Sequence, residues 1–184
     1  MVLACGAANV AFAASQRAKS PFASPSGTRG TMAGVHVVFV CSGNICRSPV
    51  AEKVFRAKLA EAGLSDGVEV SSAGIGSWHA GEPMDRRAAA ILRERGYDTT
   101  HTARQVERGQ LGADLLVAAT DDHVRDLVAA GADPERVVLL RSFDPDAPAG
   151  AEVPDPYYGG PGGFDEVMDM VEAAMPGLVA EVRP

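Results

Sequence analysis

The stretch VHVVFVCSGNICRSPV (residues 35–50) decides the fold of this chain. Its first part, VHVVFV (35–40), is a run of apolar, mainly β-branched residues, which predicts a buried strand. The letters CSGN then indicate a tight turn, and Ser48 and Pro49 are expected to supply the N-cap and the first-turn proline of a helix that stops at Gly63. A strand, a short loop and a helix in this order are typical of α/β proteins, which place ligands at the carboxyl ends of their strands.

Outward from this stretch, strand-like and helix-like segments alternate. Further buried strands are predicted at 68–74, 115–119 and 136–140, and helices at 84–95, 122–130 and 164–182. A Pro-, Asp- and Gly-rich loop at 142–163 is long for a compact domain, which indicates that it is either functional or loosely packed. This alternation predicts an α/β fold, a three-layer α/β/α sandwich around a four-stranded parallel sheet.

Composition and charge restrict the classes of protein. The chain has 184 residues, enough for one ordinary domain, and its 46% apolar and 22% charged residues exclude global disorder. No apolar run approaches the roughly 18 residues that a membrane span needs. The formal net charge of -7 argues against a nucleic acid held through phosphate contacts. We therefore expect a folded protein that works without a membrane or a nucleic-acid partner.

Residues 1–33 differ in composition from the rest of the chain. They are rich in Ala, Ser, Gly and Pro, contain no acidic residue and show no pattern of a packed element. We expect either a disordered extension or a start codon assigned upstream of Met32, with residues 34–184 forming the domain. The small apolar residues at the beginning imitate a signal peptide, but the positively charged segment that opens one is missing, so secretion by this route is not expected.

The cysteine pattern is typical of a reducing compartment. Cys5, Cys41 and Cys46 are an odd number, and Cys5 lies in the loose opening segment, so a disulfide framework is not expected. The histidines at 36, 79, 101 and 123 lack the paired spacing of a zinc module. We expect a cytoplasmic protein without a metal or another cofactor.

The segment CSGNICRS (41–48) carries the chemistry. A Gly-containing loop between a strand and a helix can turn backbone N–H groups towards an anion, and the start of the helix adds positive potential. The same groups would stabilise Cys41 as a thiolate nucleophile. Arg47 would clamp two oxygens of a phosphoryl group, and the hydroxyl of Ser48 would donate to the thiolate when it leaves. The alternative is a buried structural cysteine with a surface arginine.

Further sequence blocks accompany this octet: SSAGIGSWHAGEPMDRRA (71–88), HTARQ (101–105) and DPYYGG (155–160). With the octet they resemble the low-molecular-weight protein tyrosine phosphatases, and closely resemble the bacterial members. The resemblance covers about residues 33–182. It implies a phosphate-binding loop after the first strand and hydrolysis of phosphotyrosine in proteins or peptides, without a cofactor. A monomer is expected.

The resemblance also implies roles for individual residues. Cys41 attacks phosphorus to form a cysteinyl-phosphate, Arg47 holds the phosphoryl oxygens, and Asp155 acts as general acid and then as base. Without the tyrosines that follow it, Asp155 would be read as an ordinary Asp-Pro turn. The other residues of the phosphate-binding loop are Ser42, Gly43, Asn44, Ile45, Cys46 and Ser48. The implied supports of Asn44 are Ser72 and His101, and the implied walls of the substrate site are Trp78, Tyr157 and Tyr158. A core position is the alternative for Trp78.

Two positions depart from the family pattern. Thr120 stands beside the place where relatives commonly have an Asp that partners the histidine matched by His101, and here the carboxylates follow at Asp121 and Asp122. Ile75 stands where many relatives have Thr. Both positions concern the support of the loop, so we expect them to affect rate and stability more than the type of reaction.

Three other functions fit part of the pattern. An arsenate reductase of the same fold relays a disulfide through cysteines further along the chain, but none follows Cys46. A protein-arginine phosphatase has Thr at the position matched by Ile45, and the branched apolar Ile suits an aromatic phosphoester better. A phosphotyrosine-binding module without catalysis is disfavoured by the intact Cys41, Arg47 and Asp155.

Cys46 lies five residues after Cys41 in the same tight loop. On oxidation of Cys41, either the two cysteines close a protective disulfide or Cys46 only packs under the loop as a small hydrophobic residue.

Overall fold

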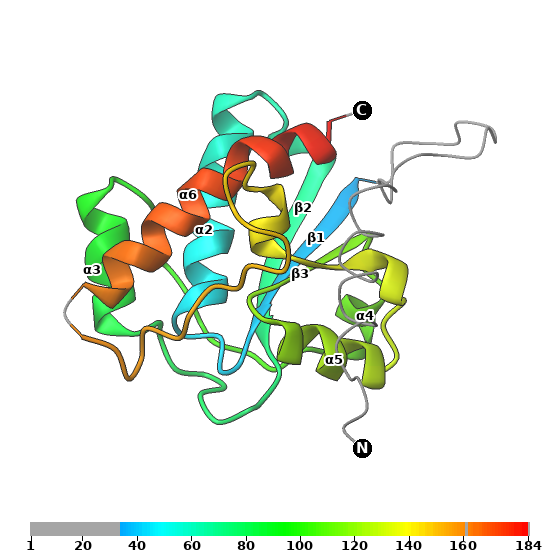
Figure 1. Cartoon of the computed structure of the whole chain (residues 1–184), viewed down its shortest axis with the longest axis horizontal. Coiled ribbons are helices and arrows are strands. Elements are labelled where there is room, and N and C mark those ends of the chain that lie inside the picture. The colour runs from blue at the N-terminus through cyan, green and yellow to red at the C-terminus, as the bar shows by residue number, and fades with distance from the viewer. Residues whose placement is uncertain (1–33, 161, 184) are drawn as a thin grey trace, which may run out of the picture.

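Four parallel strands form the centre of the molecule, as predicted. The computed structural model in Figure 1 describes residues 34–160 and 162–183. The sheet has the order β2–β1–β3–β4, with β1 (Val35–Cys41), β2 (Val68–Gly74), β3 (Leu115–Ala118) and β4 (Val137–Leu139). Because β2 and β3 lie on opposite sides of β1, the winding of the sheet reverses at the carboxyl end of β1. Open α/β sheets bind ligands at such a reversal.

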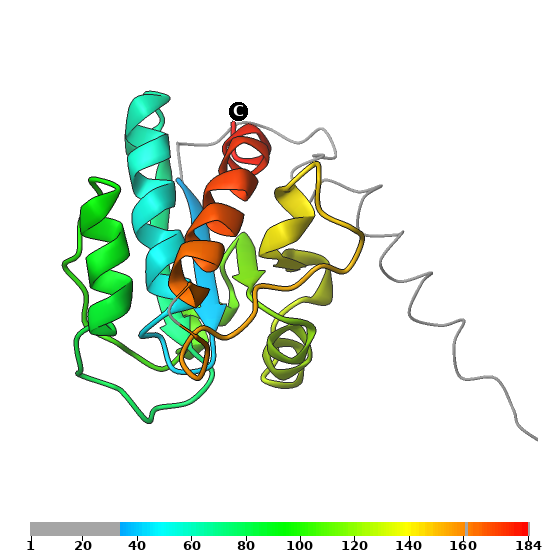
Figure 2. The ribbon, with the colours of Figure 1, turned by 60° about the vertical axis from the view of Figure 1, so that its left-hand side comes forward.

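Helices cover both faces of the sheet, which confirms the predicted α/β/α sandwich. The helices are α2 (Arg47–Glu61), α3 (Arg86–Glu94), α4 (Arg108–Leu111), α5 (Asp121–Ala129) and α6 (Gly163–Glu181). Short 3-10 turns are η1 (Ser65–Gly67), η2 (Pro134–Arg136) and η3 (Leu140–Phe143). Figures 1 and 2 show α2, α3 and α6 on one face and α5 on the other.

Alternate residues of β1 pack into two separate cores. Val37 and Phe39 belong to the core shared with α2 and α6, whereas Val38 and Val40 belong to the core shared with α5. The rings of Phe39 and Phe55 meet edge to face, with their centres 5.6 Å apart. Burial on both faces explains why β1 reads as an unbroken apolar run.

Helix α2 begins earlier than expected, and the prediction that Ser48 is its N-cap is wrong. The N-cap position is Cys46, whose side chain makes no capping hydrogen bond, and Ser48 lies in the first turn. The Ser48 hydroxyl is used inside the loop instead, 3.0 Å from Cys41 Sγ. The predicted stop at Gly63 agrees with the structure, because the helix ends at Glu61 and Gly63 has a φ of 69°.

The other elements shift at their ends. The predicted helix at 84–95 begins only at Arg86, because the Asp85 carboxylate accepts from the Arg87 N–H at 2.7 Å and caps it. The predicted strand at 136–140 is shorter, since Leu140 already belongs to the turn η3. The sequence did not predict α4 or the 3-10 turns, which are too short to show a periodic pattern.

The expectations for residues 1–33 lie outside the described residues. In the part of the chain that the structure describes, no helix combines the length and the apolar character that a bilayer span requires.

Candidate active site

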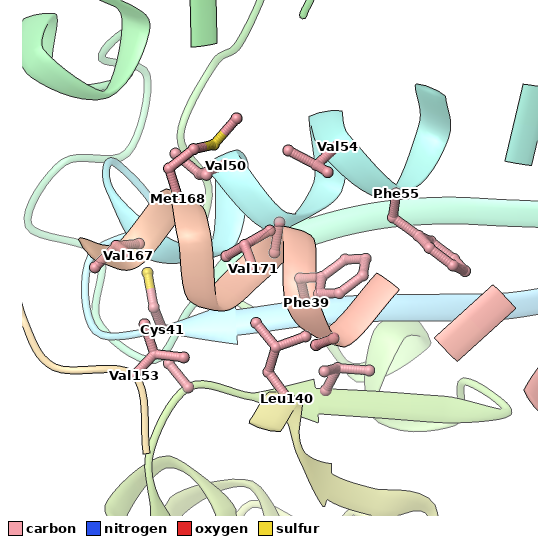
Figure 3. Packing of buried hydrophobic residues seen from close by; sticks show 14 of the residues in the cluster. Phe39, Cys41, Val50, Val54, Phe55, Leu140, Val153, Val167, Met168 and Val171 are labelled. Carbon is pink, nitrogen blue, oxygen red and sulfur yellow. The ribbon is translucent and has the colours of Figure 1, made fainter. Parts of the chain in front are cut away.

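Cys41 is the last residue of β1, and the loop 42–46 begins directly after it. The residue is 2% exposed and belongs to the same buried cluster as Val153 and Val167 (Figure 3). The strand therefore fixes the cysteine at the reversal point of the sheet, and the apolar cluster holds its side chain on one side.

Among the described residues, most carbonyl groups of the loop 42–46 accept a hydrogen bond, whereas its N–H groups donate none. The carbonyl oxygens of Ser42 and Ile45 accept from the backbone N–H groups of Gly76 and Asp85, at 2.9 and 2.8 Å. Within the described residues, by contrast, no N–H group of residues 42–46 donates a hydrogen bond to the protein. Backbone donors are normally paired, and successive unpaired N–H groups in a tight loop are typical of an anion site.

Asn44 holds this loop in shape. It has a φ of 57°, a left-handed conformation that Asn tolerates better than most residues. Its Nδ2 donates to Ser48 Oγ and Ser72 Oγ, both at 2.9 Å, and its Oδ1 accepts from the Arg104 N–H at 2.9 Å. Its carbonyl oxygen accepts from His101 Nε2 at 2.7 Å. The structure thus brings together Asn44 and both of its predicted supports.

A buried carboxylate stands behind these supports. Ser72 Oγ donates to Glu52 Oε2 at 2.6 Å, and Glu52 Oε1 accepts from Arg56 Nε at 3.0 Å. Burial lowers the pKa of His101 below its usual value, although the hydrogen bond to Asn44 opposes this. His101 is therefore neutral at pH 7 and donates one ring N–H. Buried polar groups satisfied in this way form a rigid support.

Arg47 reaches across the loop to the segment that carries Asp155. It is 5% exposed, and its Nη2 lies 3.0 Å from both Ser42 Oγ and Asp155 Oδ2. Its Nη1 donates to the Val153 carbonyl oxygen at 3.2 Å. Its buried Nε has no hydrogen-bond partner among the described residues. One donor of the guanidinium group is therefore available to an oxyanion, beside the thiol and the carboxylate.

Two thiols lie in this region, and they differ in character. Cys41 Sγ lies 3.0 Å from Ser48 Oγ, which also has the Ala73 carbonyl oxygen within reach at 3.2 Å. Burial raises the pKa of Cys46 to about 12, and the negative charge of Asp85 adds to this rise. Cys46 stays protonated at neutral pH, so it does not compete with Cys41 as a nucleophile. Both are free thiols, and the disulfide between them stays a prediction.

Two rings from the β2–α3 connection border the loop. Trp78 is 72% exposed, so the alternative of a core position is wrong, and its ring covers Gly76, where a Cβ atom would clash. His79 covers Gly43 in the same way, because an added Cβ would lie 2.8 Å from its Cδ2. The centre of the His79 ring is 6.5 Å from that of Tyr157. His79 thus lies between the loop and the segment of the predicted acid.

Arg87 of α3 holds Tyr157 at this border. Its Nη1 donates to the Tyr157 carbonyl oxygen at 3.2 Å, and its guanidinium carbon lies 5.5 Å from the Tyr157 ring centre and 4.7 Å from that of Phe164. The Asp85 carboxylate accepts from Arg87 Nε and Nη2, which lowers the pKa of Asp85. Tyr158 meets Tyr157 edge to face but is 90% exposed.

The departure at Thr120 affects a different histidine from the one expected. Thr120 is the N-cap of α5, and its Oγ1 lies 2.9 Å from His123 Nδ1. In the described part of the chain, no hydrogen bond joins it to His101. The following carboxylates, Asp121 and Asp122, both pair with Arg125 on the outside of α5.

Ile75, the second departure, supports the loop through its backbone. Its N–H donates to the Cys41 carbonyl oxygen at 2.9 Å, and its own carbonyl oxygen accepts from Gln105 Nε2 at 3.0 Å. Its side chain packs against the core on the α5 side. None of these contacts requires a hydroxyl group at this position.

Several residues of this site were not predicted from the sequence. They are Glu52, His79, Arg87, His123 and the carbonyl group of Val153. Glu52 gave a usable signal, because a carboxylate on the apolar face of a predicted helix needs a partner when it is buried. The others gave none, since their contacts cross between segments that the sequence cannot place relative to one another. Within residues 34–160 and 162–183, no group of three or more His, Cys, Asp or Glu side chains could hold a metal ion.

Comparisons with known proteins show which family the chain is similar to. Residues 36–184 match the family model described as low molecular weight phosphotyrosine protein phosphatase. The low molecular weight protein-tyrosine phosphatase A of Mycobacterium tuberculosis is 52% identical over 145 residues, which are 78% of this chain and 89% of that protein.

Solved structures share the fold. The crystal structure of YfkJ from Bacillus subtilis has a TM-score of 0.75 and 36% identity, and the match covers 83% of this chain and 96% of that one. The YwlE arginine phosphatase has a TM-score of 0.71 at only 26% identity, over 79% of this chain and 94% of that one. The chain belongs to the low molecular weight phosphotyrosine protein phosphatase family.

Proposed function

We propose that this chain is a protein-tyrosine phosphatase that works through a phosphorylated Cys41. One observation carries the proposal: the unused N–H groups of the loop 42–46 and the unpaired Nε of Arg47 surround the end of β1, where Cys41 lies. An oxyanion bound there is neutralised by fixed donors, which stabilises charge that develops in a transition state. A phosphoryl group is the ligand that best fits such an anion-binding loop beside a thiol.

In the first step, the Cys41 thiolate attacks phosphorus. The S–P bond forms while the bond between phosphorus and the phenolic oxygen breaks, and Asp155 donates a proton to that oxygen as it leaves. Loop N–H groups and Arg47 hold the remaining phosphoryl oxygens. In the protein without a bound anion, Arg47 Nη2 donates to Asp155 Oδ2 at 3.0 Å, so a phosphoryl dianion competes for the same donor. This competition frees the carboxylate, which takes up a proton from solvent and then faces the leaving oxygen as the acid.

In the second step, water hydrolyses the cysteinyl-phosphate. Asp155 takes a proton from the water, whose oxygen bonds to phosphorus while the S–P bond breaks. The departing thiolate receives a hydrogen bond from Ser48 Oγ, which lies 3.0 Å away. Inorganic phosphate and the original enzyme result, with Asp155 protonated again. The side chains of Asn44, Ser72, His101 and Glu52 position the loop and do not touch the reacting atoms.

Aromatic phosphoesters suit this site better than the alternatives. Ile45 is apolar, whereas an arginine phosphatase is expected to have Thr at this position. Tyr157 and Trp78 supply aromatic surface at the border of the active site. We therefore propose tyrosine-phosphorylated proteins or peptides as substrates. Turnover of one peptide carrying phosphotyrosine, phosphoserine or phosphoarginine tests this directly. We expect the phosphotyrosine form to have the highest kcat/KM, and a preference for phosphoarginine would overturn the assignment.

Trp78→Ala is expected to reduce kcat/KM for aryl phosphates about three- to tenfold, because an exposed ring that contacts the substrate ring contributes roughly 0.5–1.5 kcal/mol. Alkyl phosphates should lose less than about twofold. The measurement is the ratio of kcat/KM for phenyl phosphate and an alkyl phosphate, compared in both enzymes. An unchanged ratio would remove Trp78 from the substrate wall. Tyr158→Ala removes an aromatic ring that is more exposed than Trp78. The same ratio measured in this variant shows whether Tyr158 also contacts the substrate ring.

We further propose that residues 34–184 act as one catalytic domain, as a monomer in the cytoplasm. The family match begins at residue 36, which supports the domain boundary. Large apolar side chains exposed among the described residues are Trp78, Val128, Tyr157 and Tyr158, and all but Val128 lie at the border of the active site. That distribution supports a surface used for substrate rather than for a permanent partner.

A further inference from the structure

His123 is a buried histidine beside the catalytic loop to which neither the motifs nor the proposed mechanism gives a role. It lies in the first turn of α5 and is 5% exposed. Its Nε2 lies 2.9 Å from Ser42 Oγ, and its Nδ1 lies 2.9 Å from Thr120 Oγ1. Both ring nitrogens therefore have a hydroxyl partner, one on the catalytic loop and one at the start of α5.

Ser42 connects this histidine to the catalytic arginine. It directly follows Cys41, and its Oγ accepts from Arg47 Nη2 at 3.0 Å. A continuous chain of hydrogen bonds thus runs from Thr120 through His123 and Ser42 to Arg47. The chain of contacts connects three segments: the start of α5, the loop 42–46 and α2.

The surroundings keep the imidazole ring neutral. Burial lowers the pKa of His123 to about 4, and the positive charge of Arg47 adds to this, while Asp126, Asp122 and Asp155 oppose it. A neutral ring has one N–H donor and one acceptor nitrogen. It can therefore bridge two hydroxyl groups without bringing a second positive charge close to the guanidinium group.

We propose that His123 is a positioning residue: held by Thr120, it fixes the hydroxyl of Ser42 and through it the guanidinium group of Arg47 in the place where a phosphoryl group is clamped. This inference rests on the proposed function, in which Arg47 binds the phosphoryl oxygens. It gives the departure at Thr120 a specific meaning, because the threonine hydroxyl serves this bridge and not His101.

Orthovanadate is an anion that resembles the phosphoryl group in the transition state. Its inhibition constant therefore reports directly how well Arg47 and the loop bind the phosphoryl group. His123→Ala leaves Ser42 Oγ and Arg47 with one support fewer, and loss of a buried hydrogen bond of this kind should raise the vanadate inhibition constant about tenfold. The inhibition constant does not depend on how much of the sample is folded. A purely structural role for His123 would lower kcat and leave this constant unchanged.

Two conservative variants separate the bridge from simple space filling. The amide group of Gln falls near Nε2 of the original ring and can reach Ser42, whereas the shorter Asn places its amide near Nδ1, within reach of Thr120 only. We expect His123→Gln to restore vanadate inhibition to within about threefold of wild type and His123→Asn to resemble His123→Ala. Equal inhibition constants for the Gln and Asn variants would overturn the proposal.

A double-mutant cycle tests whether the effect passes through Ser42. If His123 acts through that hydroxyl, His123→Ala should change the vanadate constant less than about twofold when Ser42 is already Ala. Full additivity of the two substitutions would contradict the chain of contacts. If His123→Ala does not fold, Thr120→Val replaces it in the double-mutant cycle with Ser42→Ala, because Thr120 holds the other ring nitrogen of His123. Thr120→Val should then change the vanadate inhibition constant less than about twofold when Ser42 is already Ala.

His36 provides a matched control. Its Nε2 lies 3.0 Å from Ser71 Oγ, so it makes the same kind of contact, but at the amino end of β1, away from the catalytic loop. His36→Ala should leave vanadate inhibition unchanged. Failure of this inference is distinguishable from failure of the proposed function. If Cys41→Ser is inactive but the His123 variants have the vanadate inhibition constant of the wild type, only the positioning role is refuted. The proposed function then still holds.

Discussion

Cys41→Ser is expected to abolish hydrolysis of p-nitrophenyl phosphate while the protein still binds orthovanadate. The serine hydroxyl is a far weaker nucleophile and leaving group than a thiolate, so the loss in kcat should exceed about 10³-fold. Vanadate binding should survive, because the loop N–H groups and Arg47 remain in place. Steady-state turnover and equilibrium binding of vanadate, measured on the same preparation, check both statements.

Cys5→Ser is the control for removal of a thiol, since Cys5 lies in residues 1–33 and outside all of the matched motifs. It should retain wild-type turnover. If Cys41→Ser kept more than a few per cent of the wild-type rate, the covalent mechanism would be refuted. Treatment with a chelator should leave the wild-type rate unchanged, because every role in the proposed mechanism is filled by a side chain or a backbone group.

Asp155→Ala should slow poor leaving groups much more than good ones. Proton transfer to the departing oxygen contributes about 10²- to 10⁴-fold, and a phenol that leaves easily needs little of it. Across a series of substituted phenyl phosphates, the dependence of kcat/KM on the pKa of the leaving phenol should therefore be steeper in the variant than in the wild type. Equal slowing across the series would show that Asp155 is not the acid.

Asp146 offers the matched control for this series. It lies on the same connection between η3 and α6 and is exposed, and its backbone N–H is bound to Asp144 Oδ1 at 3.0 Å. Asp146→Ala removes the same charge from the same loop without touching Arg47. We expect it to change neither the rates nor their dependence on the leaving group. A change of similar size in both variants would indicate a general effect of loop charge.

The fold was predictable where its signals are local. The strand, turn and helix of residues 35–63 follow one another directly, so their character depends on short-range patterns such as the buried run of β1 and the turn at Gly63. The position of Ser48 was not predictable in the same way, because Ser-Pro before a helix normally indicates a cap. Here the loop 42–46 needs the hydroxyl for Cys41 and Asn44, and this tertiary demand overrides the local preference.

The candidate site shows the same division. Cys41, Arg47 and Asp155 are predicted because their motifs resemble those of a family, although Asp155 lies far from the others in the sequence. The bridge formed by Thr120 and His123 was missed, because nothing local marks a histidine in the first turn of a helix as a partner of Ser42. Trp78 shows a third case: the sequence left a core or a border position open, and its exposure decides for the border.

The central claim is that the phosphoryl group passes through Cys41. The most direct test is to mix the Asp155→Ala variant with an aryl phosphate that has an excellent leaving group, denature the mixture rapidly, and locate the added mass by peptide mass spectrometry. The first step then needs no acid, while the second lacks its base, so the intermediate should accumulate. We predict one phosphoryl group on the peptide that contains Cys41, with release of one phenol per active site in a rapid first phase. Steady release of the phenol from the start, with no phosphoryl group on that peptide, would contradict the account.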